Sequence, residues 1–231
     1  MLRKLKGVVA ASVGLALSGS LFAAAPTVTT EVFVDKLDSP WDMVFMKDGT
    51  MFFTEKCKGL SVRMATGAVN KLHGVGATTG YSSASADLFC DGQAGMMGVA
   101  IDPQFASNRF IYVYSSSNLG GKLGNRVMRF KLNDTMTGVS DRVDIVGDIG
   151  YKPKATKHPF GGPGAHNGGR IRFSPGDGFL YVTTGDNHLG SGPQDPKYIG
   201  GKVLRVDRDG KAAADNKPPS GFDPRVFTYG H

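Results

Sequence analysis

The stretch Gly169–Asp186 reads GRIRFSPGDGFLYVTTGD and decides the fold. A short apolar strand leads into a Ser-Pro-Gly-Asp-Gly turn, and a second strand rich in aromatic and β-branched residues follows. This order predicts a β-hairpin. Residues 42–55 and 98–114 repeat the same order earlier in the chain, so the sequence predicts one structural unit that occurs three times.

Each predicted hairpin is followed by a further strand. The segments 60–64, 126–132 and 202–206 alternate apolar with basic residues, which is typical of an outer, half-exposed strand. Fourth strands are predicted at 68–72 and 140–146. Units of three to four antiparallel strands, recurring about every 55–75 residues, favour an all-β fold, a β-propeller with roughly three blades present. A β-sandwich is the alternative, and it explains the repeated order less well.

The last residues of the chain, FTYGH at 227–231, predict the start of another inner strand. Propellers typically have four to eight blades. We therefore expect this chain to be part of a longer domain.

The N-terminus has the composition of a secretory signal peptide. Residues 1–6 form a basic segment that contains Arg3, Lys4 and Lys6, residues 8–22 form an apolar run, and residues 23–25 are three alanines. The run of about 15 residues is short for a membrane span of about 20, although a retained N-terminal anchor is the alternative. We predict a signal peptide at 1–25, a partial propeller at 26–231, a periplasmic or secreted protein, and no membrane span after cleavage.

The charge of the chain argues against nucleic acid as a partner. The formal net charge is +7, from 27 basic and 20 acidic residues. Removal of the leader takes away Arg3, Lys4 and Lys6, which leaves 24 − 20 = +4. The remaining basic residues are scattered, without the clusters that bind nucleic acid.

The chain has two cysteines, Cys57 and Cys90. In an exported protein such a pair usually forms a disulfide. It would close a loop of about 34 residues and contribute about 3–4 kcal/mol in the chain-entropy model. Two separate buried thiols are the alternative.

Three residues are candidates for chemistry. His166 lies in the glycine-rich stretch GGPGAHNGGR at 161–170, where glycine would let a substrate approach the backbone, and imidazole is the usual general base near neutral pH. Asp186 ends the second strand of the same hairpin and could hold the His166 ring. Gln93 occupies the equivalent position one unit earlier, and its amide could bind a sugar hydroxyl. Each has an alternative: His166 could be a loop histidine hydrogen-bonded to the backbone, Asp186 a simple turn residue, and Gln93 a capping amide. Trp41 is predicted to lie in the core rather than to bind a ligand.

Five stretches carry a resemblance to a known family. They are SPWDMVFMKDGTMFFTEKCKGLSVR, DGQAGMMGVAIDPQFASNRFIYVYS, AHNGGRIRFSPGDGFLYVTTGDN, GGKVLRVDRDG and FTYGH, and together they cover most of residues 39–231. The chain resembles the soluble aldose sugar dehydrogenases that depend on pyrroloquinoline quinone (PQQ), also described as the glucose/sorbosone dehydrogenase family. The HxGGR stretch with its downstream TGD is the most specific match.

The resemblance implies a six-bladed propeller that binds PQQ and Ca²⁺ and oxidises the C1 hydroxyl of an aldose to a lactone, with an external electron acceptor. It implies that His166 is the base, that Asp186 is its partner and that Gln93 contacts substrate. Ala165 departs from the family, because some members have an acid there. The quinone and Ca²⁺ ligands are expected beyond His231, so we expect little activity from this chain alone. A glycan- or protein-binding propeller without activity and, less favoured, a propeller lactonase are the alternative functions.

Overall fold

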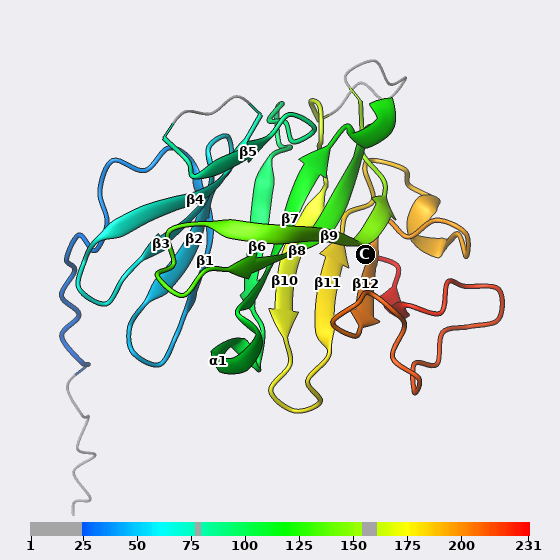
Figure 1. Cartoon of the computed structure of the whole chain (residues 1–231). Coiled ribbons are helices and arrows are strands. Elements are labelled where there is room, and N and C mark those ends of the chain that lie inside the picture. The colour runs from blue at the N-terminus through cyan, green and yellow to red at the C-terminus, as the bar shows by residue number, and fades with distance from the viewer. Residues whose placement is uncertain (1–24, 77–79, 154–160) are drawn as a thin grey trace, which may run out of the picture. The chain divides into compact units, whose positions relative to one another are not determined.

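The computed structural model describes residues 25–76, 80–153 and 161–231 (Figure 1). The predicted signal peptide, except for its last residue, lies outside the described residues. The chain divides into two compact units, Met1–Asp35 and Lys36–His231. The described residues of the first unit form neither helix nor strand, and all the strands that the structure describes belong to the second unit.

The second unit consists of three mainly antiparallel sheets whose strands follow one another in chain order (Figure 1). The first sheet contains β1 (Pro40–Phe45), β2 (Met51–Glu55), β3 (Gly59–Arg63), β4 (Val69–Val75) and the short β5 (Ser83–Ser85), which pairs parallel to β4. The second contains β6 (Met96–Ile101), β7 (Phe110–Ser117), β8 (Gly124–Leu132) and β9 (Val139–Ile149). The third contains β10 (Gly168–Phe173), β11 (Leu180–Thr184), β12 (Lys202–Val206) and β13 (Val226–Tyr229).

The described helices are short and lie in connections. They are α1 (Phe105–Asn108) and the 3₁₀ turns η1 (Leu119–Gly121) and η2 (Gly192–Gln194). Across the described ranges, no helix is long and apolar enough to cross a membrane.

Side-chain alternation along the second sheet explains why the sheets stack. On β7, Ile111 and Val113 are fully buried among residues of the first sheet, whereas Tyr112 and Tyr114 are fully buried in the cluster shared with the third sheet. Successive side chains of a strand point to opposite faces, so the middle sheet packs against a neighbour on each side. Three sheets in one repeated order confirm the predicted propeller-type units and do not fit a two-sheet sandwich.

Two details of the strand prediction are wrong. The third strands are largely buried rather than half-exposed, because a fourth strand covers each of them and their basic groups find partners. Arg205 on β12 pairs with Asp177 and Asp215. In addition, β13 does not begin a further unit, because it pairs with β12 and completes the third sheet.

One carboxylate joins all three sheets at their inner strands. Asp42 on β1 is almost completely buried and accepts hydrogen bonds from the backbone of Val99 on β6 at 3.0 Å and from Nη1 and Nη2 of Arg172 on β10, each at 2.7 Å. Arg170 on β10 also donates to it. Because these charge-assisted bonds converge on one buried group, they fix the relative positions of β1, β6 and β10.

Candidate active site

The candidate residues meet because the inner strands of the three sheets begin at one end of the unit. His166 lies just before β10, and Gln93 lies just before β6. Asp186 follows β11, which is antiparallel to β10 and therefore ends where β10 begins. The hairpin order read from the sequence thus brings the three residues to one edge.

His166 and Asp186 form a hydrogen-bonded pair with Nδ1 and Oδ1 2.7 Å apart. Burial alone would raise the pKa of Asp186, but hydrogen bonds from the His188 backbone and from the His166 ring outweigh it and hold that pKa below its usual range. An ionised carboxylate only accepts hydrogen bonds, so Nδ1 of His166 carries the proton. In the neutral form of the ring this leaves a lone pair on Nε2, and the side chain is half exposed.

The backbone of His166 is held in an unusual conformation. Its φ angle is 53°, in the left-handed region that few residues other than glycine adopt. Its N–H donates to Oε1 of Gln93 at 3.2 Å, and its carbonyl accepts from the Asn187 N–H at 3.3 Å. The His188 ring stacks on the His166 ring with centroids 3.8 Å apart. Together with the hydrogen bond to Asp186, these three contacts set the position and direction of the imidazole.

Two of the glycines around His166, Gly164 and Gly168, are required for packing within the protein. A Cβ at Gly164 would lie 2.5 Å from the side chain of Ala94, in the loop before β6. A Cβ at Gly168 would lie 2.7 Å from the backbone of the opposite strand, and Gly168 has a φ of 72°. These glycines let the loop fit between the sheets.

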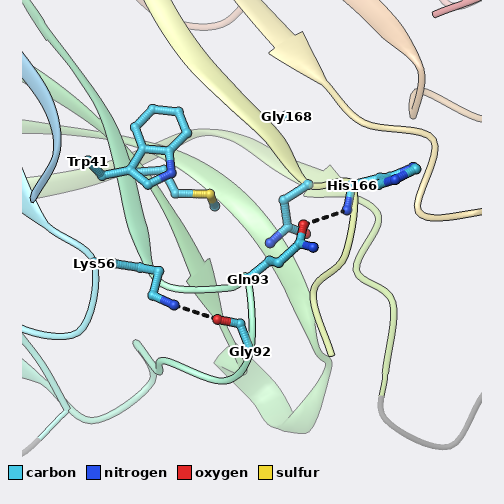
Figure 2. Close-up of a pocket in the computed structure, with 8 residues that line it drawn as sticks. Trp41, Lys56, Gly92, Gln93, His166 and Gly168 are labelled. Atoms are coloured by element: carbon cyan, nitrogen blue, oxygen red, sulfur yellow. Dashed lines mark hydrogen bonds between the residues drawn. The ribbon is translucent and has the colours of Figure 1, made fainter. Parts of the chain in front are cut away.

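A pocket of about 360 Å³ opens beside this loop (Figure 2). Trp41, predicted in the core, is half-buried: it packs against the core cluster shared by the second and third sheets and also lines this pocket. The Arg170 guanidinium lies 4.5 Å from the centre of the Trp41 ring, at cation–π distance. The pocket is lined by Trp41, Lys56, Gly92, Gln93, Met97, His166, Asn167 and Gly168.

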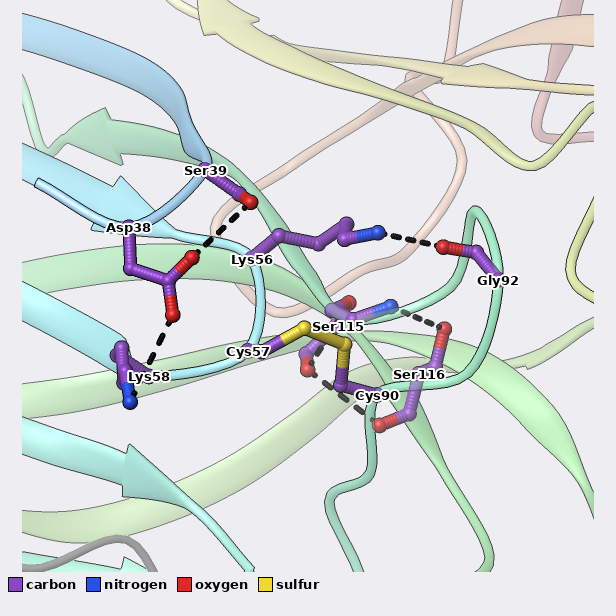
Figure 3. Close-up of a disulfide and its surroundings, with 10 residues drawn as sticks. Asp38, Ser39, Lys56, Cys57, Lys58, Cys90, Gly92, Ser115 and Ser116 are labelled. Carbon is purple, nitrogen blue, oxygen red and sulfur yellow. Dashed lines mark hydrogen bonds and ion pairs between the residues drawn. A yellow bond between two sulfur atoms is a disulfide. The ribbon is translucent and has the colours of Figure 1, made fainter.

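The predicted disulfide is present and ties two segments beside the pocket (Figure 3). Cys57 lies in the turn between β2 and β3, and Cys90 lies three residues before Gln93. The Lys56 ammonium donates to the carbonyl of Gly92 at 2.5 Å. Both links fasten the loop that carries Gln93 to the first sheet.

Three contributors to the site were not predicted from the sequence. His188 stacks on the His166 ring. Lys56 lines the pocket, and the Tyr114 hydroxyl donates to the backbone of Asn167 at 2.9 Å. For His188 the signal was available, since it lies two residues after Asp186 in the same turn. The other contacts join different sheets and leave no local pattern.

A calcium site is not evident in the described part of the chain. No three His, Cys, Asp or Glu side chains there are grouped so that they could hold a metal ion.

The chain is similar to proteins of known family. The family model described as Glucose / Sorbosone dehydrogenase matches residues 37–231. The chain belongs to this family. It is 29% identical to an aldose sugar dehydrogenase of Escherichia coli over 94% of this chain and 54% of that protein.

Solved structures agree with this assignment. A Thermus thermophilus oxidoreductase described as a glucose dehydrogenase is 30% identical, with a TM-score of 0.69 over 87% of this chain and 54% of that one. The PQQ-bound aldose sugar dehydrogenase of Streptomyces coelicolor is 26% identical, with a TM-score of 0.68 over 87% and 53% of the two chains. The propeller architecture is thereby confirmed for this member of the glucose/sorbosone dehydrogenase family. The chain spans about half the length of these relatives.

Proposed function

We propose that this chain supplies the general-base side of the active site of a PQQ-dependent aldose dehydrogenase, which oxidises the C1 hydroxyl of an aldose to the lactone. The observation that carries the proposal is the 2.7 Å pair between His166 and Asp186 at the edge of a pocket. The family, and the PQQ bound in the Streptomyces relative, support the cofactor.

The pocket is chemically suited to a flat quinone rich in acceptor oxygens. Trp41 and Met97 give it an apolar wall, whereas Gln93 and Lys56 bring N–H donors. Asn167 has a buried Nδ2 without a hydrogen-bond partner. Trp41 and Asn167 would therefore line a bound PQQ, which would supply the two-electron oxidant that receives the C1 hydrogen as hydride. No step is assigned to calcium, because the described residues do not group around a metal position.

Each residue then has a defined task. Nε2 of His166 accepts the proton of the C1 hydroxyl, because Nδ1 already carries a proton directed at Asp186. The ionised Asp186 stabilises the imidazolium that forms. Oε1 of Gln93 accepts the hydrogen bond from the His166 N–H, so the Nε2 amide group of Gln93 can donate to a sugar hydroxyl.

The disulfide supports an oxidising location, so we place the protein in the periplasm or outside the cell, where an external acceptor would reoxidise the cofactor.

The first test compares extracts of the source organism with and without the gene: deletion should remove a PQQ-dependent reduction of an artificial dye by aldoses. The second test uses the natural gene product, purified from that organism, and its His166 variant. His166→Gln should lower kcat by about 10²–10⁴-fold, since a general base contributes that much, while PQQ binding persists. Undiminished aldose oxidation in the deletion strain, or an unchanged kcat in His166→Gln, would refute the proposal.

A further inference from the structure

Lys56 places a permanent positive charge in the wall of the His166 pocket. It follows β2 directly and is half-buried. Among the residues that line the pocket it alone is always charged at neutral pH, since the other lining side chains are neutral apart from the titratable His166. Figure 2 shows it below Trp41 and beside the loop of Gly92 and Gln93.

The position of this ammonium is fixed before any ligand arrives. The Lys56 N–H donates to the carbonyl of Ser39 at 3.0 Å, and its own carbonyl accepts from the Met96 N–H at 2.8 Å. The neighbouring residue Cys57 is covalently bound to Cys90 (Figure 3). The Nζ atom donates to the Gly92 carbonyl. A group that is already ordered loses little conformational entropy when it binds a ligand.

The Lys56 ammonium also forms no ion pair in the described part of the chain. The nearby Lys58, by contrast, pairs with Asp38 at 3.6 Å. Two carboxylates lie next to these residues in the chain, Glu55 beside Lys56 and Asp91 beside Gly92, and neither forms an ion pair with Lys56 across the described ranges. Glu55 accepts the backbone N–H of Asp38 at 2.6 Å, and the site carboxylates Asp186 and Asp42 are held by His166 and by two arginines. One carbonyl satisfies only one of the three N–H donors of the ammonium.

We infer that Lys56 binds a carboxylate of the ligand in this pocket. Two ligands could bring it: an acidic sugar, such as a uronic acid with a free anomeric hydroxyl, or the quinone cofactor, which itself carries carboxylates. The first would make sugar acids a preferred substrate class of the enzyme. That the ligand is a sugar acid or PQQ rests on the proposed function. That the pocket carries a positive charge at Lys56 does not.

The test exploits Trp41, which is the only tryptophan of the chain and lines the same pocket. Its fluorescence in the 231-residue protein is titrated with sodium D-glucuronate, D-glucose and PQQ at low ionic strength. The variants are Lys56→Gln, Lys56→Arg and, as the matched control in the same turn, Lys58→Gln. Melting curves verify that each variant is folded.

With an acidic sugar as ligand, the wild type binds glucuronate about tenfold more tightly than glucose, which corresponds to about 1.4 kcal/mol. The preference is lost in Lys56→Gln, kept in Lys56→Arg and Lys58→Gln, and reduced by added salt. If instead PQQ supplies the carboxylate, its affinity falls about tenfold in Lys56→Gln but not in Lys56→Arg or Lys58→Gln, and glucuronate and glucose bind equally.

Three results overturn the inference. The affinities for glucuronate and PQQ do not change in Lys56→Gln, or they fall as much in Lys58→Gln as in Lys56→Gln, or none of the three probes shows saturable binding. Failure of the proposed function has a different signature. In that case PQQ does not bind and gene deletion removes no dehydrogenase activity, yet the Lys56-dependent preference for glucuronate remains.

Discussion

Replacement of Asp42 by alanine should destabilise the protein far more than replacement of any exposed carboxylate. The substitution removes the buried acceptor of Arg170, Arg172 and the Val99 N–H. Breaking a buried ion pair costs about 3–5 kcal/mol, and a buried N–H left without a partner costs about 1–3 kcal/mol. Both arginines are nearly half exposed, so water recovers part of the loss. We expect a net loss of about 3–4 kcal/mol.

The assay is urea unfolding of the 231-residue protein, followed by circular dichroism at pH 7. In a domain of about 200 residues each 1 kcal/mol lowers Tm by about 2–4 °C, so a thermal melt of Asp42→Ala should shift down by roughly 10 °C. The denaturant slope should stay constant, because the surface exposed on unfolding hardly changes.

Asp209→Ala is the matched control. Asp209 also joins two sheets, through a 2.6 Å ion pair with Arg129, but its carboxylate is 61% exposed. Exposed pairs contribute about 0–1 kcal/mol, so this variant should unfold within about 1 kcal/mol of the wild type. Equal losses in the two variants, or a loss below about 1 kcal/mol for Asp42→Ala, would refute the idea that one buried carboxylate holds the sheets together.

Three further predictions concern other parts of the molecule. Asp186→Asn should leave His166 as a mixture of ring tautomers in ¹⁵N NMR spectra, where the wild type shows the Nδ1–H form; an unmixed Nδ1–H signal in the variant would contradict the pairing. Burial lowers the pKa of His73 from 6.5 to about 4, so stability is complete above pH 6.5 and is lost as the pH falls toward 4. Urea unfolding should show about 2 kcal/mol less stability at pH 4.5 than at pH 7 from this group, and His73→Gln should abolish that difference. Substitution of both Cys57 and Cys90 by serine should cost about 3–4 kcal/mol, because the disulfide closes a loop with a sequence separation of 33; an unchanged urea midpoint would show that the unfolded chain is not restrained by it.

Local patterns predicted the hairpins, because alternation and turn residues are encoded within a few positions. The stretch Gly169–Asp186 forms β10 and β11, with Phe173 paired to Leu180 across the turn. The meeting of His166 and Asp186 follows from the same local register. The covalent link of Cys57 to Cys90 could also be anticipated, since the chain has no other cysteine.

Features that depend on distant segments could not be read in this way. The short, polar β5 is a strand only because it pairs parallel with β4. Lys202 looks like an exposed position of an alternating strand, yet it is 1% exposed and its ammonium donates to the carbonyls of Gly192, Pro193 and Gly200. Two of these partners lie in the 3₁₀ turn η2 and the third in the loop before β12, so no alternation along the strand points to them. The partners Asp42 and Arg170 are 128 positions apart, so no sequence period connects them.

The anchor at Asp42 also bears on the chemistry of the site. Trp41 and Asp42 are adjacent on β1: one lines the pocket, and the other binds Arg170. Arg170 in turn packs its guanidinium on the Trp41 ring and lies four residues after His166. The contact that joins the first and third sheets therefore fixes both the aromatic wall of the pocket and the strand that presents the base. Precise placement of a general base requires rigid support, and here the inner strands that hold the sheets together provide that support.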